Sequence, residues 1–280
     1  MKIHLLRCLN LHQRRKKPCS ISICNRGFTM IELMVALALT GIVLISIYNL
    51  YATQSRVYTV QEQVADMQQN ARVASNVLSR HIRMAAYGQP HWTNINGATV
   101  TYEGIRVTDG GTGNPDTIDI VGCIDEPPGT LASGGAAIGD TSITLQSSAE
   151  ASEFNTSSKC DIFIGERENA KVTGISGAAL TVDTNPSASG NQGLTYSYNA
   201  NANVYLVKRM TYAITNANLT RDENTGSGAQ QVALNIEDMQ ANFLIPSVAL
   251  SITARTKTQD RDYGYRRMTI NSDIIARNLE

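Results

Sequence analysis

Residues 28–48 form an almost uninterrupted apolar run, FTMIELMVALALTGIVLISIY, near the start of the 280-residue chain. The run holds one charged residue, Glu32. At about 1.5 Å per residue, its length matches the roughly 30 Å hydrocarbon layer of a bilayer. The pattern therefore predicts a membrane-spanning helix and makes a purely cytosolic protein a poor fit.

Beyond this run the helical period continues, but with one apolar and one polar face. The apolar positions recur at spacings of three and four, interrupted once by His81. They are Val57, Val60, Val64, Met67, Ala71, Ala74, Leu78 and Ala85. Gly88 followed by Pro90 is a typical helix stop. We expect one helix over residues 28–87, with an amphipathic continuation over 49–88. The apolar face of residues 54–86 should pack against the sheet of the carboxy-terminal domain; a simple coiled coil is the alternative.

The rest of the chain, residues 89–280, contains short strand-like runs separated by clusters of Gly, Asn and Pro. The predicted strands are 98–107, 117–121, 142–145, 161–164, 180–182, 204–214, 248–256 and 268–275. Two hairpins are expected, one around Ser176 and Gly177 and one at residues 216–218. The predicted fold class is α+β: a long amino-terminal helix packed on a β-rich carboxy-terminal head.

The formal net charge of zero conceals a basic arm and an acidic body. Of the 24 Lys and Arg residues, seven lie in residues 1–27, which contain no acid. The rest of the chain contains the remaining 17 bases and all 24 acids, so its formal net charge is −7. Bases on one side of the apolar run predict a cytoplasmic amino terminus and a head on the outer side. The head itself, with 13 bases and 21 acids, would repel nucleic acid, so we expect no nucleic-acid partner.

The junction RGFTMIEL at residues 26–33 resembles the signal of the type IV pilin superfamily. In that family a basic leader ends in Gly, the mature chain begins with Phe or Met, and Glu is the fifth mature residue. The resemblance implies a leader of residues 1–27, cleavage between Gly27 and Phe28 by a prepilin peptidase, and N-methylation of Phe28. Two alternatives are an ordinary signal peptide, for which the run is too long and lacks a clear cleavage site, and a plain membrane anchor.

Glu32 has a physical role under the same interpretation. A carboxylate near the end of a membrane helix costs on the order of a few kcal/mol unless it is paired. Cleavage after Gly27 would create a cationic amino group on Phe28. The resemblance implies that Glu32 pairs with this group on a neighbouring subunit during assembly.

Segments 69–72, 78–88, 235–240 and 265–278 are similar to the PilW-type minor pilins, although Ala86 stands where that family usually has Gly. The resemblance implies a minor subunit that assists initiation, assembly or tip structure of a type IV pilus. Its partners would be the prepilin peptidase and methyltransferase, other minor and major pilins, and the inner-membrane assembly machinery. It would reside in the inner membrane as a precursor, with its head in the periplasm, and then in the pilus or pseudopilus. A J-like minor pseudopilin of type II secretion is the nearest alternative, and a single-span periplasmic binding or sensor domain is one of a different class.

Only Cys123 and Cys160 lie beyond the apolar run. On the outer side of the membrane the compartment is oxidising, so a disulfide between them is expected. Cys8, Cys19 and Cys24 belong to the leader and would be discarded with it.

Few residues suggest chemistry. Loops 109–116 and 221–224 are rich in acids but lack the regular oxygen-ligand spacing of a calcium loop, so no metal site is expected. His81 and His91 have no Ser or Cys arrangement beside them. We therefore expect no catalytic residue, no cofactor and no enzymatic activity.

Overall fold

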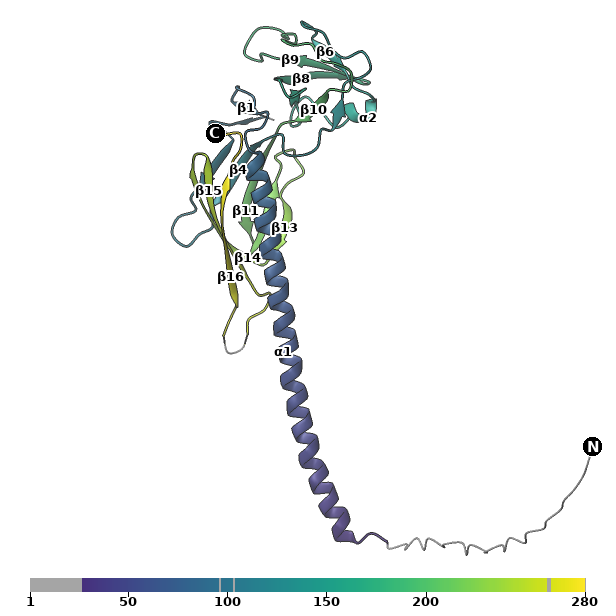
Figure 1. Ribbon diagram of the computed structural model, residues 1–280, viewed down its shortest axis with the longest axis vertical. Helices are drawn as coiled ribbons and strands as arrows, with labels where there is room; N and C mark the ends of the chain where they lie inside the picture. The colour runs from purple at the N-terminus through teal and green to yellow at the C-terminus, as the bar shows by residue number, and fades with distance from the viewer. Residues whose placement is uncertain (1–26, 96, 103, 261–262, 280) are drawn as a thin grey trace, which may run out of the picture. The chain divides into compact units, whose positions relative to one another are not determined.

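The computed structural model describes residues 27–95, 97–102, 104–260 and 263–279 (Figure 1). The chain forms two compact units, Met1–Arg56 and Val57–Glu280, whose boundary lies within helix α1 (Met30–Met84). The second unit therefore contains the last part of that helix together with the head. The predicted leader lies outside the described residues, apart from Gly27.

Helix α1 falls inside the predicted range 28–87 and ends as expected. After Met84 the backbone becomes left-handed at Ala86 (φ 64°) and at Gly88 (φ 64°), a common way to end a helix. The N–H of Ala86 donates to the carbonyl of Val121 at 2.8 Å, which ties the helix end to the head. Glycine adopts this left-handed backbone more readily than alanine does, so Ala86 adds some strain at the helix end.

The head consists of sixteen short strands and one short helix, α2 (Ser148–Ala151), within the described residues. The strands are β1 (Asn94–Ile95), β2 (Ala98–Thr99), β3 (Ile105–Thr108), β4 (Thr117–Gly122), β5 (Gly129–Thr130), β6 (Ser142–Thr144), β7 (Asp161–Ile164), β8 (Glu168–Ser176), β9 (Ala179–Asp183), β10 (Asn203–Leu206), β11 (Lys208–Thr215), β12 (Asn218–Asp222), β13 (Gln230–Leu234), β14 (Ile236–Leu244), β15 (Ser247–Arg255) and β16 (Arg267–Ile275).

The strands form four antiparallel sheets. A five-stranded sheet has the order β13-β12-β11-β4-β3, and a three-stranded sheet has the order β14-β15-β16. A six-stranded sheet, β5-β10-β7-β8-β9-β6, contains most of residues 129–206, and β1 pairs only with β2. Because β10 and β11 follow one another in the chain but belong to different sheets, the chain crosses between sheets at Val207.

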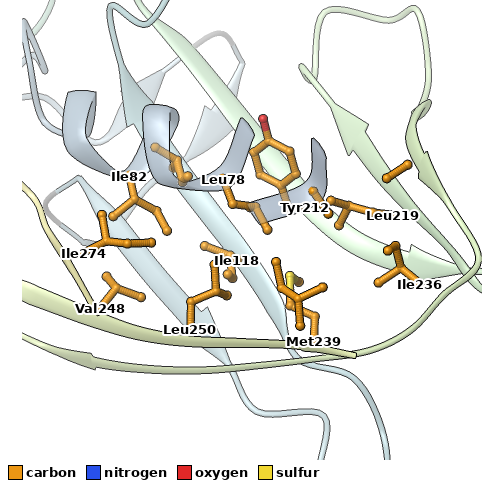
Figure 2. Close-up of a cluster of buried hydrophobic side chains, with 14 of the residues drawn as sticks. Leu78, Ile82, Ile118, Tyr212, Leu219, Ile236, Met239, Val248, Leu250 and Ile274 are labelled. Atoms are coloured by element: carbon orange, nitrogen blue, oxygen red, sulfur yellow. The ribbon is translucent and has the colours of Figure 1, made fainter. Parts of the chain in front are cut away.

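The head half of α1 packs on the five-stranded and three-stranded sheets (Figure 2). Alternate residues of the strands point inward, as the burial of Val248, Leu250 and Ile252 along β15 shows. The helix contributes Met67, Ala71, Ala74, Leu78, Ile82 and Ala85 to this core. The predicted fold, a long apolar helix packed on a β-rich carboxy-terminal domain, is therefore confirmed.

The start of the predicted apolar stripe is wrong in detail. Val57 is 49% exposed, and Val60 and Val64 are only partly buried. Val64 already packs against the core of the head, and the stripe is buried from Met67 onward. The helical period identifies the face that packs, but not the point at which the sheets begin to cover it.

The six-stranded sheet has a hydrophobic core of its own, which includes Leu131, Ile162 and Val204. A smaller third cluster is built from residues of β1 and β4 and from residues that follow or link strands. Its buried members are Ile95, Val100, Val121, Cys123 and Val207. The head thus has two main cores with a small third one, although the sequence suggests a single β-rich domain.

Both predicted hairpins are confirmed. Ser176 pairs with Ala179, which leaves a two-residue turn at Gly177 and Ala178. Thr215 pairs with Asn218, and the two residues between them, Asn216 and Ala217, have φ values of 52° and 57°. Two positive φ values are the signature of a type I′ turn, which suits the twist of paired strands.

Two predicted strands are interrupted. The run 98–107 contains β2 and β3 as separate strands, divided by a turn that includes Gly104 with φ 70°. The run 204–214 is divided at Val207, whose N–H donates to the carbonyl of Asp161 at 2.9 Å. The strands β1, β5, β13 and β14 lie outside the predicted runs and hairpins.

Candidate processing and assembly site

The amino-terminal part of α1 exposes nearly all of its apolar side chains. Within the described residues, every position from 27 to 59 is exposed except Gly41, which is partly buried. One 18-residue window of the helix has a mean hydropathy of 2.4 with none of it buried. By length and composition this part of α1 could cross a membrane. So much uncovered apolar surface would be unstable in water and needs lipid or other subunits around it.

The predicted cleavage point lies just before the helix. Gly27 and Phe28 are exposed and outside regular structure, and α1 begins at Met30. A Cβ added at Gly27 would meet nothing within 4 Å. The peptide bond between the two residues is therefore accessible. Packing within this chain does not require glycine at position 27.

Glu32 closes the start of α1 through Thr29. The Glu32 carboxylate oxygen Oε2 accepts the Thr29 N–H at 2.8 Å and the Thr29 hydroxyl at 2.9 Å. In return the Thr29 hydroxyl oxygen accepts the N–H of Glu32 at 3.3 Å. This reciprocal pattern is a capping box, which satisfies backbone donors at the first helical turn. The sequence carries the signal for this box, Thr followed three residues later by Glu, but an interpretation of Glu32 by its charge alone does not use it.

Capping leaves the charge of Glu32 unbalanced. Within the residues that the structure describes, Glu32 forms no ion pair, and all three hydrogen bonds of the capping box involve Oε2 or the backbone rather than Oε1. The carboxylate can therefore cap its own helix and still offer an oxygen to a cation from outside.

The expected disulfide between Cys123 and Cys160 is absent, and both residues are buried thiols. Cys123 belongs to the small cluster near the helix end, whereas Cys160 belongs to the core of the six-stranded sheet. Burial raises the pKa of the Cys123 thiol far above its usual range and that of Cys160 to about 11. An oxidising compartment allows a disulfide only where the fold places two cysteines close together. Here the fold places them in different cores.

The two acidic loops use their carboxylates in turns. Asp116 accepts the N–H of Gly110 at 3.0 Å and the N–H of Ala241 at 2.8 Å, which fastens loop 109–116 to β14. Asp222 accepts the N–H of Asn224 at 2.8 Å. Among the described residues no group of three or more His, Cys, Asp or Glu side chains is placed to hold a metal ion.

His81 lies buried in the interface between α1 and the head. Its Nδ1 forms a short hydrogen bond with the hydroxyl of Tyr212 on β11. Burial, followed by the nearby Arg221, lowers the pKa of His81 to about 4. The neutral ring is therefore part of the helix–sheet packing, whereas His91 is exposed and packs edge to face with Trp92.

This burial predicts a pH dependence of stability. The pKa of His81 in the folded state, about 4, is below its ordinary value of 6.5, so the unfolded chain binds the proton first. The stabilisation should be complete above about pH 6.5 and decline as the pH falls towards 4, by about 2 kcal/mol after allowance for solvent screening. Urea unfolding of the full-length protein in detergent at several pH values measures this slope. His81→Gln should flatten it and His91→Gln should not; an unchanged slope in His81→Gln would assign it to other groups.

The carboxy-terminal residues meet the end of α1. The N–H of Arg277 donates to the carbonyl of Arg83 at 3.4 Å, and Asn278 Nδ2 donates to the carbonyl of Ala85 at 3.0 Å. Segments 78–88 and 265–278 are thus joined in space. The carboxy terminus and the end of α1 therefore form one structural feature.

Comparison with known proteins gives one match. Residues 24–48 match the family model of the prokaryotic N-terminal methylation motif. No curated protein and no solved structure matches the chain. The matched residues include Gly27, Phe28 and Glu32, so the match and the geometry of the helix start concern the same site. Together they support a type IV pilin-like prepilin, processed at its amino terminus and anchored by an apolar helix that is consistent with an inner-membrane segment.

Proposed function

We propose that the chain is a minor-pilin-like subunit that assists initiation, assembly or tip structure of a type IV pilus. It enters the inner membrane as a precursor, with the head on the periplasmic side. It is cleaved between Gly27 and Phe28 and methylated at Phe28. The observation that carries the proposal concerns helix α1. Its exposed apolar part starts within a methylation motif, and its last turns pack in a folded head.

The physical role follows from what surrounds the helix before and after assembly. In the precursor, lipid covers the apolar side chains of residues 28–48. In a filament, the same side chains would be covered by the helices of neighbouring subunits. Transfer from lipid to a helix bundle keeps apolar surface out of water throughout, so no step exposes the anchor.

The proposed partners follow from the same sequence of events. They are the prepilin peptidase and methyltransferase, other minor and major pilins, and the inner-membrane assembly machinery. The similarity of segments 78–88 and 265–278 to PilW-type subunits favours a pilus over its nearest alternative, a J-like minor pseudopilin of type II secretion. The functions encoded by neighbouring genes would separate the two.

The proposal is tested by intact-mass and amino-terminal analysis of the protein extracted from membranes. A mature chain that begins with N-methylated Phe28 supports it. A chain that keeps its Met1 leader in cells containing the peptidase would contradict it and favour a single-span binding or sensor domain.

Glu32 provides a second test. Glu32→Ala should still be cleaved and methylated, but its incorporation into filaments should fall at least about tenfold, because an amino group of a neighbouring subunit would lose its partner in an apolar bundle. The measurement is the amount of the chain in sheared filaments relative to the membrane fraction.

Glu32→Gln is the matched control, because glutamine can still accept the hydrogen bonds from Thr29 but has no charge. Loss of incorporation in both variants assigns the effect to the charge. Normal incorporation of Glu32→Gln would reduce the role of Glu32 to helix capping.

A further inference from the structure

The charges on the outward face of the head half of α1 are separated along the helix. We call this set the α1 outer face; it consists of Glu62, Asp66, Arg72, Arg80 and Arg83. All five side chains are exposed, on the side of the helix opposite the buried Met67, Ala71 and Leu78. Within the part of the chain that the structure describes, none of the five forms an ion pair. The acids come first along the helix and the arginines follow.

The basic end of this face is part of a hollow. Arg80 and Arg83 line a hollow of about 560 Å³ together with Arg277 from the carboxy terminus, and we call it the arginine hollow. Asp273 of β16 is the acid among the lining residues, so the hollow keeps an excess of positive charge. The head as a whole is acidic, which makes a local group of three arginines without ion pairs a distinct feature.

The acidic end differs in shape. Asp66 lines a second hollow, of about 560 Å³, in which Lys257 is the basic residue, but the two form no ion pair within the described residues. Glu62 lies one turn earlier on the same side of the helix and projects into solvent. The two carboxylates are therefore accessible to an arginine from another molecule.

The spacing of the two ends decides which arrangement of neighbouring molecules is favourable. Glu62 and Arg80 are 18 positions apart, which is about five helical turns and about 27 Å along the axis. Because this is a whole number of turns, both residues lie on the same side of the helix. Two parallel copies at the same height would place Glu62 beside Glu62 and Arg80 beside Arg80. A displacement of about 27 Å would instead bring Glu62 of one copy to Arg80 of the other.

We propose that the α1 outer face docks a second copy of this chain, parallel and displaced by about 27 Å along the helix. The acidic pair Glu62 and Asp66 of one copy occupies the arginine hollow of the next. The proposal rests on the proposed function, because insertion of every copy with the same topology makes the helices parallel. Anchors at equal depth in a membrane hold copies level, so the charge pattern opposes association there and favours it once one copy has been moved outward into a filament.

Cross-linking in cells that contain the assembly machinery tests the displacement. Two full-length copies with different tags are expressed together, one carrying Tyr58→Cys and the other Asn76→Cys. These positions are exposed, lie beside Glu62 and Arg80 respectively, and are also 18 residues apart. After treatment with a short bismaleimide, we expect the 58–76 product in sheared filaments to exceed the 58–58 and 76–76 products. Equal yields, a dominant 58–58 or 76–76 product, or no cross-link between processed copies would overturn the proposal.

Charge exchange gives the matched control. Arg80→Glu with Arg83→Glu in the copy carrying Asn76→Cys should reduce the 58–76 product about three- to tenfold, as expected for exposed ion pairs. Glu62→Arg with Asp66→Arg in the other copy should restore it. Arg106→Glu on β3, an exposed arginine away from the helix, should have no effect. An equal loss with Arg106→Glu, or no restoration by the exchanged pair, would assign the effect to net charge.

Amino-terminal analysis of the same samples separates this inference from the proposed function. A chain that begins with methylated Phe28 and appears in filaments, yet gives no displaced product, contradicts only the docking of a second copy. A chain that keeps its leader and is absent from filaments contradicts both.

Discussion

A Gly27→Val precursor is expected to remain uncleaved in the membrane while its head folds normally. A peptidase that cuts after residue 27 must bring the carbonyl carbon of that residue to its catalytic groups. A branched side chain at this position moves the peptide bond away from them, and a displacement of about 1 Å can slow a reaction about 100-fold. The structure adds that a Cβ at Gly27 meets nothing within 4 Å, so the substitution should not disturb the protein itself.

The measurement is the ratio of full-length to cleaved chain in membrane extracts, by intact mass. Gly41→Ala is the control, because Gly41 lies in the apolar part of α1 and also has open space around it. That variant should be processed normally. Normal processing of Gly27→Val would place the cleavage point elsewhere and remove the basis for methylation at Phe28.

The long helix could be predicted from the sequence because its signal is local and repeated. A period of 3.6 residues persists from the apolar run to Ala85, and the stop at Gly88 needs only neighbouring residues. The hairpin at Asn216 and Ala217 is of the same kind, since a two-residue turn depends on the residues that occupy it.

The features that could not be predicted depend on residues far apart in the chain. The run 204–214 is rich in strand-forming residues throughout, yet the N–H of Val207 donates to Asp161, and the strand is divided between two sheets. Cys123 and Cys160 likewise fall into separate cores for reasons that their spacing does not contain. The arginine hollow unites Arg83 with Arg277, which no local pattern connects.

The candidate site lies between these extremes. The motif can be recognised from the sequence alone, because Gly27, Phe28 and Glu32 are close together in the chain. The structure adds that Oε2 of Glu32 accepts both hydrogen bonds from Thr29, which leaves Oε1 available to a cation from outside. A residue that is interpreted only as an assembly charge therefore also determines where the helix begins, which is why variants at this position need the glutamine control.

The largest expected loss of stability comes from a different glycine, at the far end of the same helix. Gly88 has a left-handed backbone (φ 64°), and a Cβ added there would lie 2.6 Å from Cδ1 of Phe163 and 2.7 Å from Sγ of Cys123. Gly88→Ala should therefore combine backbone strain with a clash inside a packed cluster, and lower the free energy of unfolding by about 3–4 kcal/mol. Phe163 belongs to β7 of the six-stranded sheet, so the clash would disturb the contact between that sheet and the helix end.

Gly111→Ala separates the two contributions. Gly111 also has a left-handed backbone (φ 81°), but a Cβ there would meet nothing within 4 Å. Strain alone should lower the free energy of unfolding by about 1 kcal/mol. Urea unfolding of the full-length variants in detergent measures both values. Amino-terminal analysis should show that both are still processed, because the proposed cleavage point lies just before α1 and both glycines lie beyond its other end. Equal losses in the two variants would mean that the cluster around Gly88 yields to the added methyl group. A much larger loss at Gly88 would show that close packing of the helix end against Phe163 and Cys123 contributes to the stability of the head.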